Sequence, residues 1–201
     1  KRKNISKIGL LGHSEGGIIA PWYATNQNNI EFIIMLAAPG VEPKEMMHEQ
    51  RKLQTELMGG SLFAIKMQEK MFREIDSTVL NTNNSSTLAK NLRKITDKQI
   101  NMVLGAEKQK EDLASQIIPF VTSKWYKSFI LVNPNDYLSK IKCPVLAING
   151  NKDMQVPMEM NLNAIENSLK NGKCKDYTIL RKENLNHLFQ HCKIGSVSEY
   201  S

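Results

Sequence analysis

The sequence has few cysteines, few aromatic residues and no long apolar run. Among its 201 residues are three cysteines, and phenylalanine, tryptophan and tyrosine together make up 6%. Cys143, Cys174 and Cys192 match no zinc-binding spacing, and an odd number cannot all pair within the chain. No stretch approaches the roughly 18 consecutive apolar residues of a membrane span. These scarcities predict free thiols, and they argue against a cysteine-based zinc site and a membrane-spanning helix.

The charge of the chain is basic but scattered. A formal net charge of +7 raises the question of a nucleic-acid partner. Most lysines lie among acidic residues, and only Lys1, Arg2, Lys3 and Lys7 form a local cluster. We therefore predict no nucleic-acid binding. With 41% hydrophobic residues, the chain can bury one core of ordinary size beside an inserted subdomain.

Strand-length apolar runs alternate with helix-length segments at both ends of the chain, which predicts a parallel α/β sheet. The predicted strands are 5–12, 30–38, 145–149 and 175–180. The predicted helices are 15–25 and 158–169. The predicted α/β core therefore comprises residues 1–41 and 137–201.

Residues 42–136 differ in composition from both ends. This section is rich in Lys, Glu, Gln, Met and Leu, and it is too long to be structureless inside a compact domain. We predict a helical cap insertion with breaks at Gly59-Gly60, at 81–86 and at Pro119. Its larger apolar side chains either line an acyl pocket or pack the cap interior. They are Met46, Met47, Met58, Met67, Met71, Met102, Trp125, Tyr126 and Phe129.

The sequence Gly12-His13-Ser14-Glu15-Gly16 fits the pattern G-x-S-x-G after the first predicted strand. In this pattern the serine lies on a sharp strand-to-helix turn that exposes its hydroxyl above the sheet. Both glycine positions are expected to be too crowded for a side chain. We predict Ser14 as a nucleophile and the backbone N–H of Glu15 as one oxyanion donor, at the positive end of the following helix.

A serine nucleophile needs a histidine base, and the chain has four histidines. His13 is expected to point the other way along the turn, and His48 falls in the helical insertion. His187 follows the last predicted strand, at an expected loop-to-helix transition, and is the predicted base; His191 is the alternative.

The base in turn needs a carboxylate to hold its tautomer, and the usual chain order in this arrangement is Ser, acid, His. Asp153 comes directly after the strand 145–149, at the rim where parallel sheets place their sites. It is the predicted acid. Asp136 precedes that strand and Asp176 begins the next one, so both are weaker alternatives.

With these residues assigned, the chain resembles the α/β-hydrolase superfamily, and within it the bacterial serine-aminopeptidase-like or carboxylesterase group. The matching segments are KIGLLGHSEGGIIAP, CPVLAINGNKDMQVP and NLNHLFQ. The resemblance implies a triad of Ser14, Asp153 and His187 under a helical cap. The family's earlier strands and its second oxyanion donor have no counterpart here. We therefore expect a missing N-terminal part or another chain to cover the exposed edge of the first strand.

The function predicted from these residues is serine hydrolysis of small carboxylic esters or thioesters through an acyl-enzyme on Ser14. Two alternatives remain open: an aminopeptidase-type amide hydrolase, and a catalytically silent hydrolase-like binding protein. No metal ion and no organic cofactor is implied.

Overall fold

The computed structural model describes residues 4–27, 29–103 and 107–201, with side chains left out at 100–110. The charged residues at positions 1–3 and the side chain of Met102 therefore lie outside the description. The chain divides into two compact units, Lys1–Gln50 with Asn133–Ser201, and Arg51–Val132. These limits differ from the predicted insertion 42–136, because residues at each end of that range group with the sheet.

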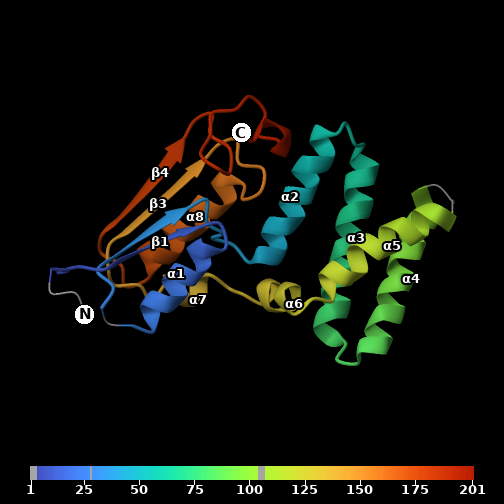
Figure 1. The fold of residues 1–201 in the computed structure, drawn as a ribbon, viewed down its shortest axis with the longest axis horizontal. Helices are drawn as coiled ribbons and strands as arrows, with labels where there is room; N and C mark the ends of the chain where they lie inside the picture. The colour runs from blue at the N-terminus through green and yellow to red at the C-terminus, as the bar shows by residue number, and fades with distance from the viewer. Residues whose placement is uncertain (1–3, 28, 104–106) are drawn as a thin grey trace. The chain divides into compact units, whose positions relative to one another are not determined.

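The first unit contains a four-stranded parallel sheet (Figure 1). Its strands are β1 (Gly9–His13), β2 (Phe32–Leu36), β3 (Val145–Gly150) and β4 (Tyr177–Lys182), paired in the order β1-β2-β3-β4. All four predicted strands are present, with shifted bounds. Because every pairing is parallel, the carboxyl ends of the four strands lie at one edge of the sheet.

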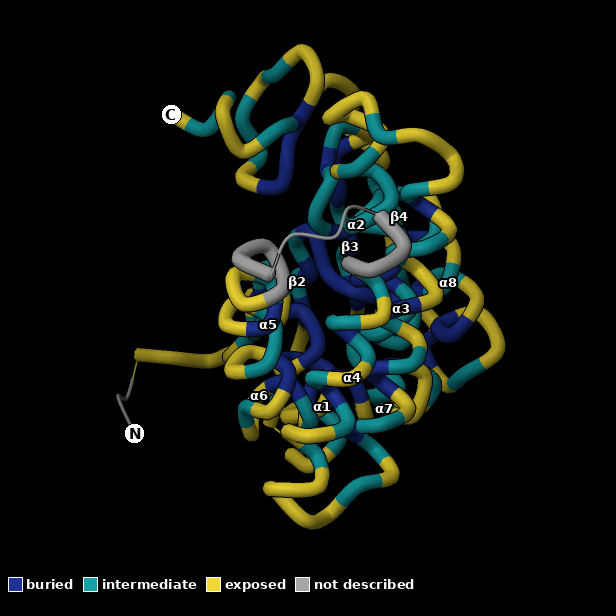
Figure 2. The backbone as a smooth tube through the Cα atoms, turned by 90° about the vertical axis from the view of Figure 1, so that its right-hand side faces the viewer, coloured by how far each residue is buried: buried dark blue, intermediate teal, exposed yellow. Residues whose placement is uncertain are grey.

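Three helices of this unit pack on one face of the sheet. They are α1 (Gly16–Thr25), α7 (Asn135–Leu138) and α8 (Met158–Asn171). Ile33 and Met35 of β2 point toward them and are almost fully buried, as are Val145 and Ala147 of β3. Alternate residues of a strand point to opposite faces, so this pattern identifies the core face. The predicted parallel α/β fold is confirmed, and its buried stretches are dark blue in Figure 2.

The opposite face of the sheet includes exposed apolar side chains. Leu11 on β1 is 64% exposed and Phe32 on β2 is 40% exposed. Gly9 pairs with Phe32, so Leu11, two residues further along β1, shares that face. β1 pairs with β2 alone among the described strands, and it is therefore an edge strand.

The second unit is helical and is considered by itself. It contains the end of α2 (Pro43–Leu57) and all of α3 (Leu62–Asn81), α4 (Ser85–Val103), α5 (Glu107–Val121) and α6 (Lys124–Ile130). The predicted breaks at 59–60 and 81–86 are confirmed. The predicted break at Pro119 is wrong, since α5 continues to Val121. Pro119 lacks the N–H that would donate to the carbonyl four residues earlier, so it removes one helical hydrogen bond, and α5 ends two residues after it.

A polar group lies inside the helical unit. The Tyr126 hydroxyl donates to Oδ1 of Asp76 at 2.5 Å, and both residues are buried. The Arg51 guanidinium lies 3.6 Å from the centre of the Phe72 ring. Met71 is also buried, so Tyr126 and Met71 both pack the interior of this unit.

None of the described helices is long and apolar enough to cross a membrane.

Candidate active site

Ser14 lies at a strained turn between β1 and α1. Its φ of +55° is a left-handed value that a non-glycine residue seldom adopts. Two backbone hydrogen bonds stabilise this conformation. Ser14 N–H donates to the carbonyl of Leu36, and Gly17 N–H donates to the carbonyl of Ser14. The N–O distances are 2.9 and 2.8 Å. A turn of this kind raises the serine side chain above the strand ends.

The glycines around Ser14 differ in how tightly they are packed. A Cβ atom at Gly12 would lie 2.0 Å from the backbone oxygen of Gly16. A Cβ atom at Gly17 would lie 2.2 Å from the Cβ of Ala38. At Gly16 nothing lies within 4 Å, so the expectation of a crowded Gly16 is wrong. The close approach of α1 to the sheet takes place one residue later, at Gly17.

Asp153 lies in the loop after β3 and its side chain is fully buried. Its Oδ1 atom accepts the backbone N–H groups of Gln155 and Val156 at 2.9 and 2.8 Å. Its Oδ2 atom lies 2.9 Å from Nδ1 of His187. Both carboxylate oxygens therefore have partners, which stabilises a buried negative charge beside the imidazole.

Asn149 holds the loop that contains Asp153. Its side chain is fully buried at the end of β3. The Nδ2 group donates to the carbonyl of Val156 at 2.8 Å, and Oδ1 accepts the N–H of Gly150 at 2.7 Å. Asn149 therefore closes the loop from inside, because it bonds both Gly150, the last residue of β3, and Val156, whose N–H donates to Asp153.

His187 lies in a tight turn after β4, and its side chain is 6% exposed. Asn186, which is fully buried, fixes this turn: its Oδ1 accepts the backbone N–H groups of Leu188 and Gln190, both at 3.0 Å. The expected loop-to-helix transition is wrong, because the turn leads into irregular chain. A side chain that bonds its own backbone two and four residues on favours a turn over a helix.

The two loops are joined by backbone and side-chain bonds. Lys152 N–H donates to the carbonyl of Leu185 at 3.1 Å, and Asn184 N–H donates to Oδ1 of Asn151 at 2.8 Å. A Cβ atom at Gly150 would lie 2.1 Å from the backbone oxygen of Leu185. The loops are therefore packed backbone to backbone, and this contact sets the position of His187 relative to Asp153.

His13 lies against His187, contrary to the expectation that it points the other way. Its Nε2 atom is 2.8 Å from the carbonyl oxygen of His187, and the centroids of the two rings are 4.7 Å apart. The expectation failed because it followed the chain direction at the turn and left out the loop after β4. The structure thus brings together the residue next to Ser14 and the residue that contacts Asp153.

The other candidate residues lie elsewhere. His48 is on α2 and Asp136 is on α7, while Asp176 immediately precedes β4. His191 is exposed and forms a single antiparallel bridge with Leu185. None of these four is among the recorded partners of Asp153 or His187 in the described part of the chain.

Glu15 occupies the N-cap position of α1 with helical backbone angles, φ −53° and ψ −34°. Its N–H group is therefore at the amino end of a ten-residue helix. Within the described residues, no hydrogen bond joins the Ser14 hydroxyl to the His187 ring. Such bonds are often long in free enzymes and shorten when substrate binds.

The C-terminal segment packs beside the Asp153 loop. The Gln155 side-chain amide donates to the Tyr200 hydroxyl at 2.7 Å. Burial, which is the larger cause, and the nearby Asp153 carboxylate raise the pKa of Tyr200 above its usual value, while the bond from Gln155 opposes them. A Cβ atom at Gly195 would lie 1.9 Å from the backbone oxygen of Lys152. This segment therefore covers the outside of the loop that contains the buried carboxylate.

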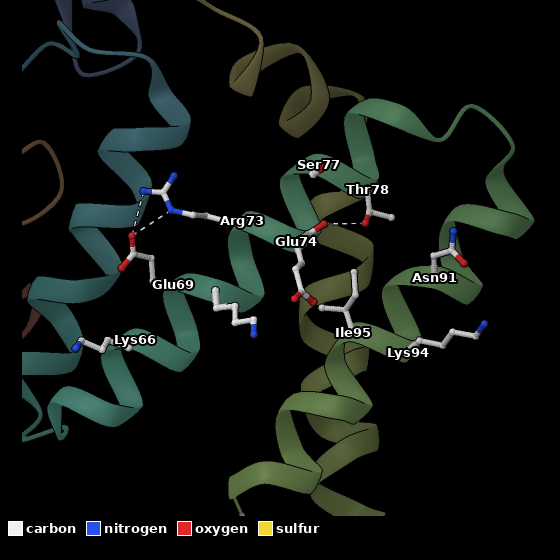
Figure 3. A pocket seen from close by; sticks show the side chains of 10 residues that line it. Lys66, Glu69, Arg73, Glu74, Ser77, Thr78, Asn91, Lys94 and Ile95 are labelled. Carbon is white, nitrogen blue, oxygen red and sulfur yellow. Dashed lines mark hydrogen bonds and ion pairs between the residues drawn. The ribbon is translucent and has the colours of Figure 1, made fainter.

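A groove lies within the helical unit. It has a volume of about 860 Å³, lies along α3 and α4, and is lined mainly by charged side chains (Figure 3). Arg73 and Glu69 form an ion pair of 3.1 Å at its side. None of the predicted site residues lines this groove. No cluster of three or more metal-ligating side chains occurs in the described ranges.

Comparison with known proteins gives likenesses of structure alone. No protein-family model matches the chain, and no curated protein matches its sequence. An esterase from Pyrococcus furiosus shares 15% identity with a TM-score of 0.45, covering 88% of this chain and 44% of that one. An α/β-fold hydrolase from Bacillus anthracis shares 21% identity with a TM-score of 0.46, covering 91% and 62%. An esterase from Exiguobacterium antarcticum shares 15% identity with a TM-score of 0.43, covering 92% and 61%.

The chain thus spans between 44% and 62% of the length of these three proteins. At such identities a likeness concerns the fold, and it transfers no substrate and no activity. The structure itself has a parallel strand order, a strained turn at Ser14 after β1, and loops with Asp153 and His187 after β3 and β4. By this architecture the chain has a parallel α/β fold of the kind that the sequence predicts.

Proposed function

We propose that this protein is a serine hydrolase that cleaves carboxylic esters or thioesters through an acyl-enzyme on Ser14. The observation that most supports the proposal is the 2.9 Å contact between Asp153 Oδ2 and His187 Nδ1. This contact joins the buried carboxylate of Asp153 to the imidazole of His187. The backbone carbonyl of His187 is in turn bonded to the side chain of His13, the residue before Ser14. In the proposal, Asp153 keeps the proton of His187 on Nδ1, so that Nε2 is free to accept a proton from Ser14.

The acylation step follows from these roles. As the Ser14 oxygen forms a bond to the carbonyl carbon, its proton passes to Nε2 of His187 and the carbonyl electrons move to oxygen. When this tetrahedral intermediate collapses, the bond to the alcohol or thiol breaks and His187 returns the proton to the leaving group. Asp153 remains ionised and stabilises the imidazolium that forms between the two events.

The developing oxyanion needs donors, and the proposal assigns the Glu15 N–H as one of them. Its support is positional, since Glu15 directly follows the nucleophile and begins α1. Backbone N–H groups at a helix N-terminus favour negative charge, and donors aimed at the oxyanion are often the largest single contribution to such catalysis. No residue is assigned as the second donor.

Deacylation repeats the sequence with water. The oxygen of a water molecule attacks the acyl carbon while His187 accepts a proton from that water. The bond between the acyl carbon and the Ser14 oxygen then breaks, and His187 returns the proton to Ser14. Esters and thioesters are the favoured class because their leaving groups depart more readily than amines. An amide substrate would use the same residues and needs a stronger proton donation to its leaving nitrogen.

Activity against chromogenic esters of graded acyl length tests the proposal, with the full natural polypeptide compared with Ser14→Ala. We expect turnover in the wild type and none above background in the variant. Ser77→Ala, at an exposed position on α3, is the matched control and retains full activity. Equal turnover by wild type and Ser14→Ala removes Ser14 from the mechanism. Turnover of amides alone favours the aminopeptidase alternative, and no turnover of either class favours a silent binding protein.

The role of residues 42–136 as a cap belongs to the same proposal. Its support is the chain path, because the insertion leaves the sheet after the carboxyl end of β2, the edge at which Ser14 follows β1. If Met46 and Met47 line an acyl pocket, replacing both with alanine changes the preferred acyl length. An unchanged acyl-length profile would show that both methionines only pack the interior.

We also propose that a further polypeptide segment, supplied by additional chain or by a partner, covers the edge of β1 and the adjoining exposed face of the sheet. Parallel sheets are normally covered on both faces, and this one exposes Leu11 and Phe32. Leu11→Asp in the full natural polypeptide should lower the free energy of unfolding by about 2 kcal/mol or more if the face is covered. A change within about 0.5 kcal/mol would mean that Leu11 stays in solvent.

A further inference from the structure

The geometry points to His13 as a positioning residue that fixes the backbone of His187 relative to Ser14. His13 is the last residue of β1 and immediately precedes Ser14, whereas His187 lies 174 residues later, after β4. The inference rests on the proposed catalytic roles of Ser14 and His187. It adds a role for a residue that the proposed mechanism does not otherwise use.

The first supporting observation is the hydrogen bond itself. The Nε2 atom of His13 lies 2.8 Å from the backbone carbonyl oxygen of His187. A carbonyl oxygen only accepts, so the proton of this bond belongs to His13 Nε2. This bond therefore fixes a protonated Nε2 on His13, and it holds the main chain of His187 without forming a hydrogen bond to its imidazole.

The second observation is ring packing. The rings of His13 and His187 lie 4.7 Å apart, centroid to centroid, with an interplanar angle of 47°. The Phe189 ring lies 6.4 Å from the His13 ring, centroid to centroid, at an interplanar angle of 63°. His13 therefore contacts the turn of His187 through ring packing as well as through its hydrogen bond.

Together, these contacts complete a three-part support for the base. Asp153 holds the imidazole of His187 through Nδ1, and Asn186 shapes the turn through two backbone bonds. Neither joins His187 to β1, the strand that immediately precedes Ser14. His13 does, so it is the part that sets the separation of nucleophile and base. A displacement near 1 Å at reacting groups can reduce the rate by about 100-fold.

Substitutions that separate the hydrogen bond from the ring test this role. His13→Phe keeps a ring and loses the donor. His13→Gln places an amide nitrogen four bonds beyond Cα, as Nε2 of histidine is, and restores a donor at that position. His13→Asn carries its amide nitrogen one bond shorter, where it does not reach. A side chain that only fills space would make His13→Phe the best of the three variants, because its ring is closest in shape to that of histidine, whereas a hydrogen-bond role makes His13→Gln the best.

The readout is the second-order rate of labelling by a fluorophosphonate in the full natural polypeptide, with the unfolding midpoint recorded for every variant. We expect His13→Phe and His13→Asn to label roughly 10-fold to 100-fold more slowly than wild type. We expect His13→Gln to return to within about threefold of wild type, since the bond is restored. His191→Gln, at an exposed histidine, is the control and labels at the wild-type rate.

Two outcomes overturn the inference. In one, His13→Phe and His13→Asn label as fast as wild type, so the bond does not affect the base. In the other, His13→Gln is as slow as the rest, so the donor is not what matters. If His13→Phe fails to fold, His13→Met, which matches the length of glutamine and lacks the donor, replaces it in the comparison with His13→Gln. Absence of labelling in the wild type contradicts the proposed function itself, which distinguishes that failure from a failure of the His13 role.

Discussion

Asp153→Asn isolates the charge of the predicted acid from its structural bonds. The asparagine oxygen can still accept the backbone N–H groups of Gln155 and Val156, as Oδ1 of Asp153 does at 2.9 and 2.8 Å. The amide nitrogen then replaces Oδ2, which lies 2.9 Å from Nδ1 of His187. Two donors cannot bond each other, so His187 moves its proton from Nδ1 to Nε2.

The expected effect on rate follows from that tautomer. With a proton on Nε2, the imidazole cannot accept the proton of Ser14, and in serine proteases the corresponding exchange reduces kcat by about 10⁴-fold. This corresponds to about 5.4 kcal/mol of transition-state stabilisation at 1.36 kcal/mol per factor of ten. The free energy of unfolding should fall by only about 1 kcal/mol, because a charge-assisted bond is exchanged for a neutral one.

Ester hydrolysis and denaturant unfolding, measured on the same preparations, check both numbers. Asp153→Ala is the matched comparison, since it also removes the acceptor of two backbone N–H groups. Each of these, if left buried without a partner, costs about 1–3 kcal/mol. The reasoning is refuted if Asp153→Asn retains kcat within about tenfold of wild type, or if Asp153→Ala unfolds at the same denaturant concentration as Asp153→Asn.

Three further predictions concern packing, turns and pH. Gly12→Ala should destabilise the fold by about 1–3 kcal/mol because its Cβ would meet a backbone oxygen at 2.0 Å, whereas Gly16→Ala, with open space around it, should be neutral or stabilising in denaturant unfolding. Asn186→Ala should lower stability by about 1–3 kcal/mol and slow ester hydrolysis, and Asn186→Asp, which keeps the acceptor, should lose less. Burial, and then the bond to Asp76, raise the pKa of Tyr126 above its usual 10. The folded protein therefore holds the phenolic proton more tightly, and the stability from this difference is present below about pH 10 and lost as the pH rises beyond it. The difference in unfolding free energy between wild type and Tyr126→Phe should shrink above pH 10, and a constant difference would contradict this.

Much of the sheet could be predicted because its signals are local. Buried parallel strands appear as short apolar runs, and the runs around Ile33 and Ala147 were recognisable for that reason. Helix breaks at 59–60 and 81–86 followed from glycine and from asparagine and serine clusters. Pro119 misled because a proline removes only one helical hydrogen bond, and α5 continues for two residues beyond it.

The residues that position Asp153 and His187 could not be predicted from local sequence signals. His13, Asn149 and Asn186 act through partners that are distant in sequence or through backbone bonds inside a turn. Asn149 and Asn186 are common turn residues, and nothing in their spacing distinguishes a fully buried side chain from an exposed one. The one available indication was position, since each lies within a few residues of Asp153 or His187. The contact of His13 with His187 requires knowledge of how the loops after β1 and β4 meet at the sheet edge.

The most direct test of the central claim is labelling of the full natural polypeptide with a fluorophosphonate, followed by peptide mapping. An activated serine reacts with this probe and an ordinary hydroxyl does not, so the experiment reports activation and position together. The account predicts a single modified residue, Ser14, with labelling abolished by His187→Ala. Labelling at another serine, or undiminished labelling of Ser14 in His187→Ala, would contradict it.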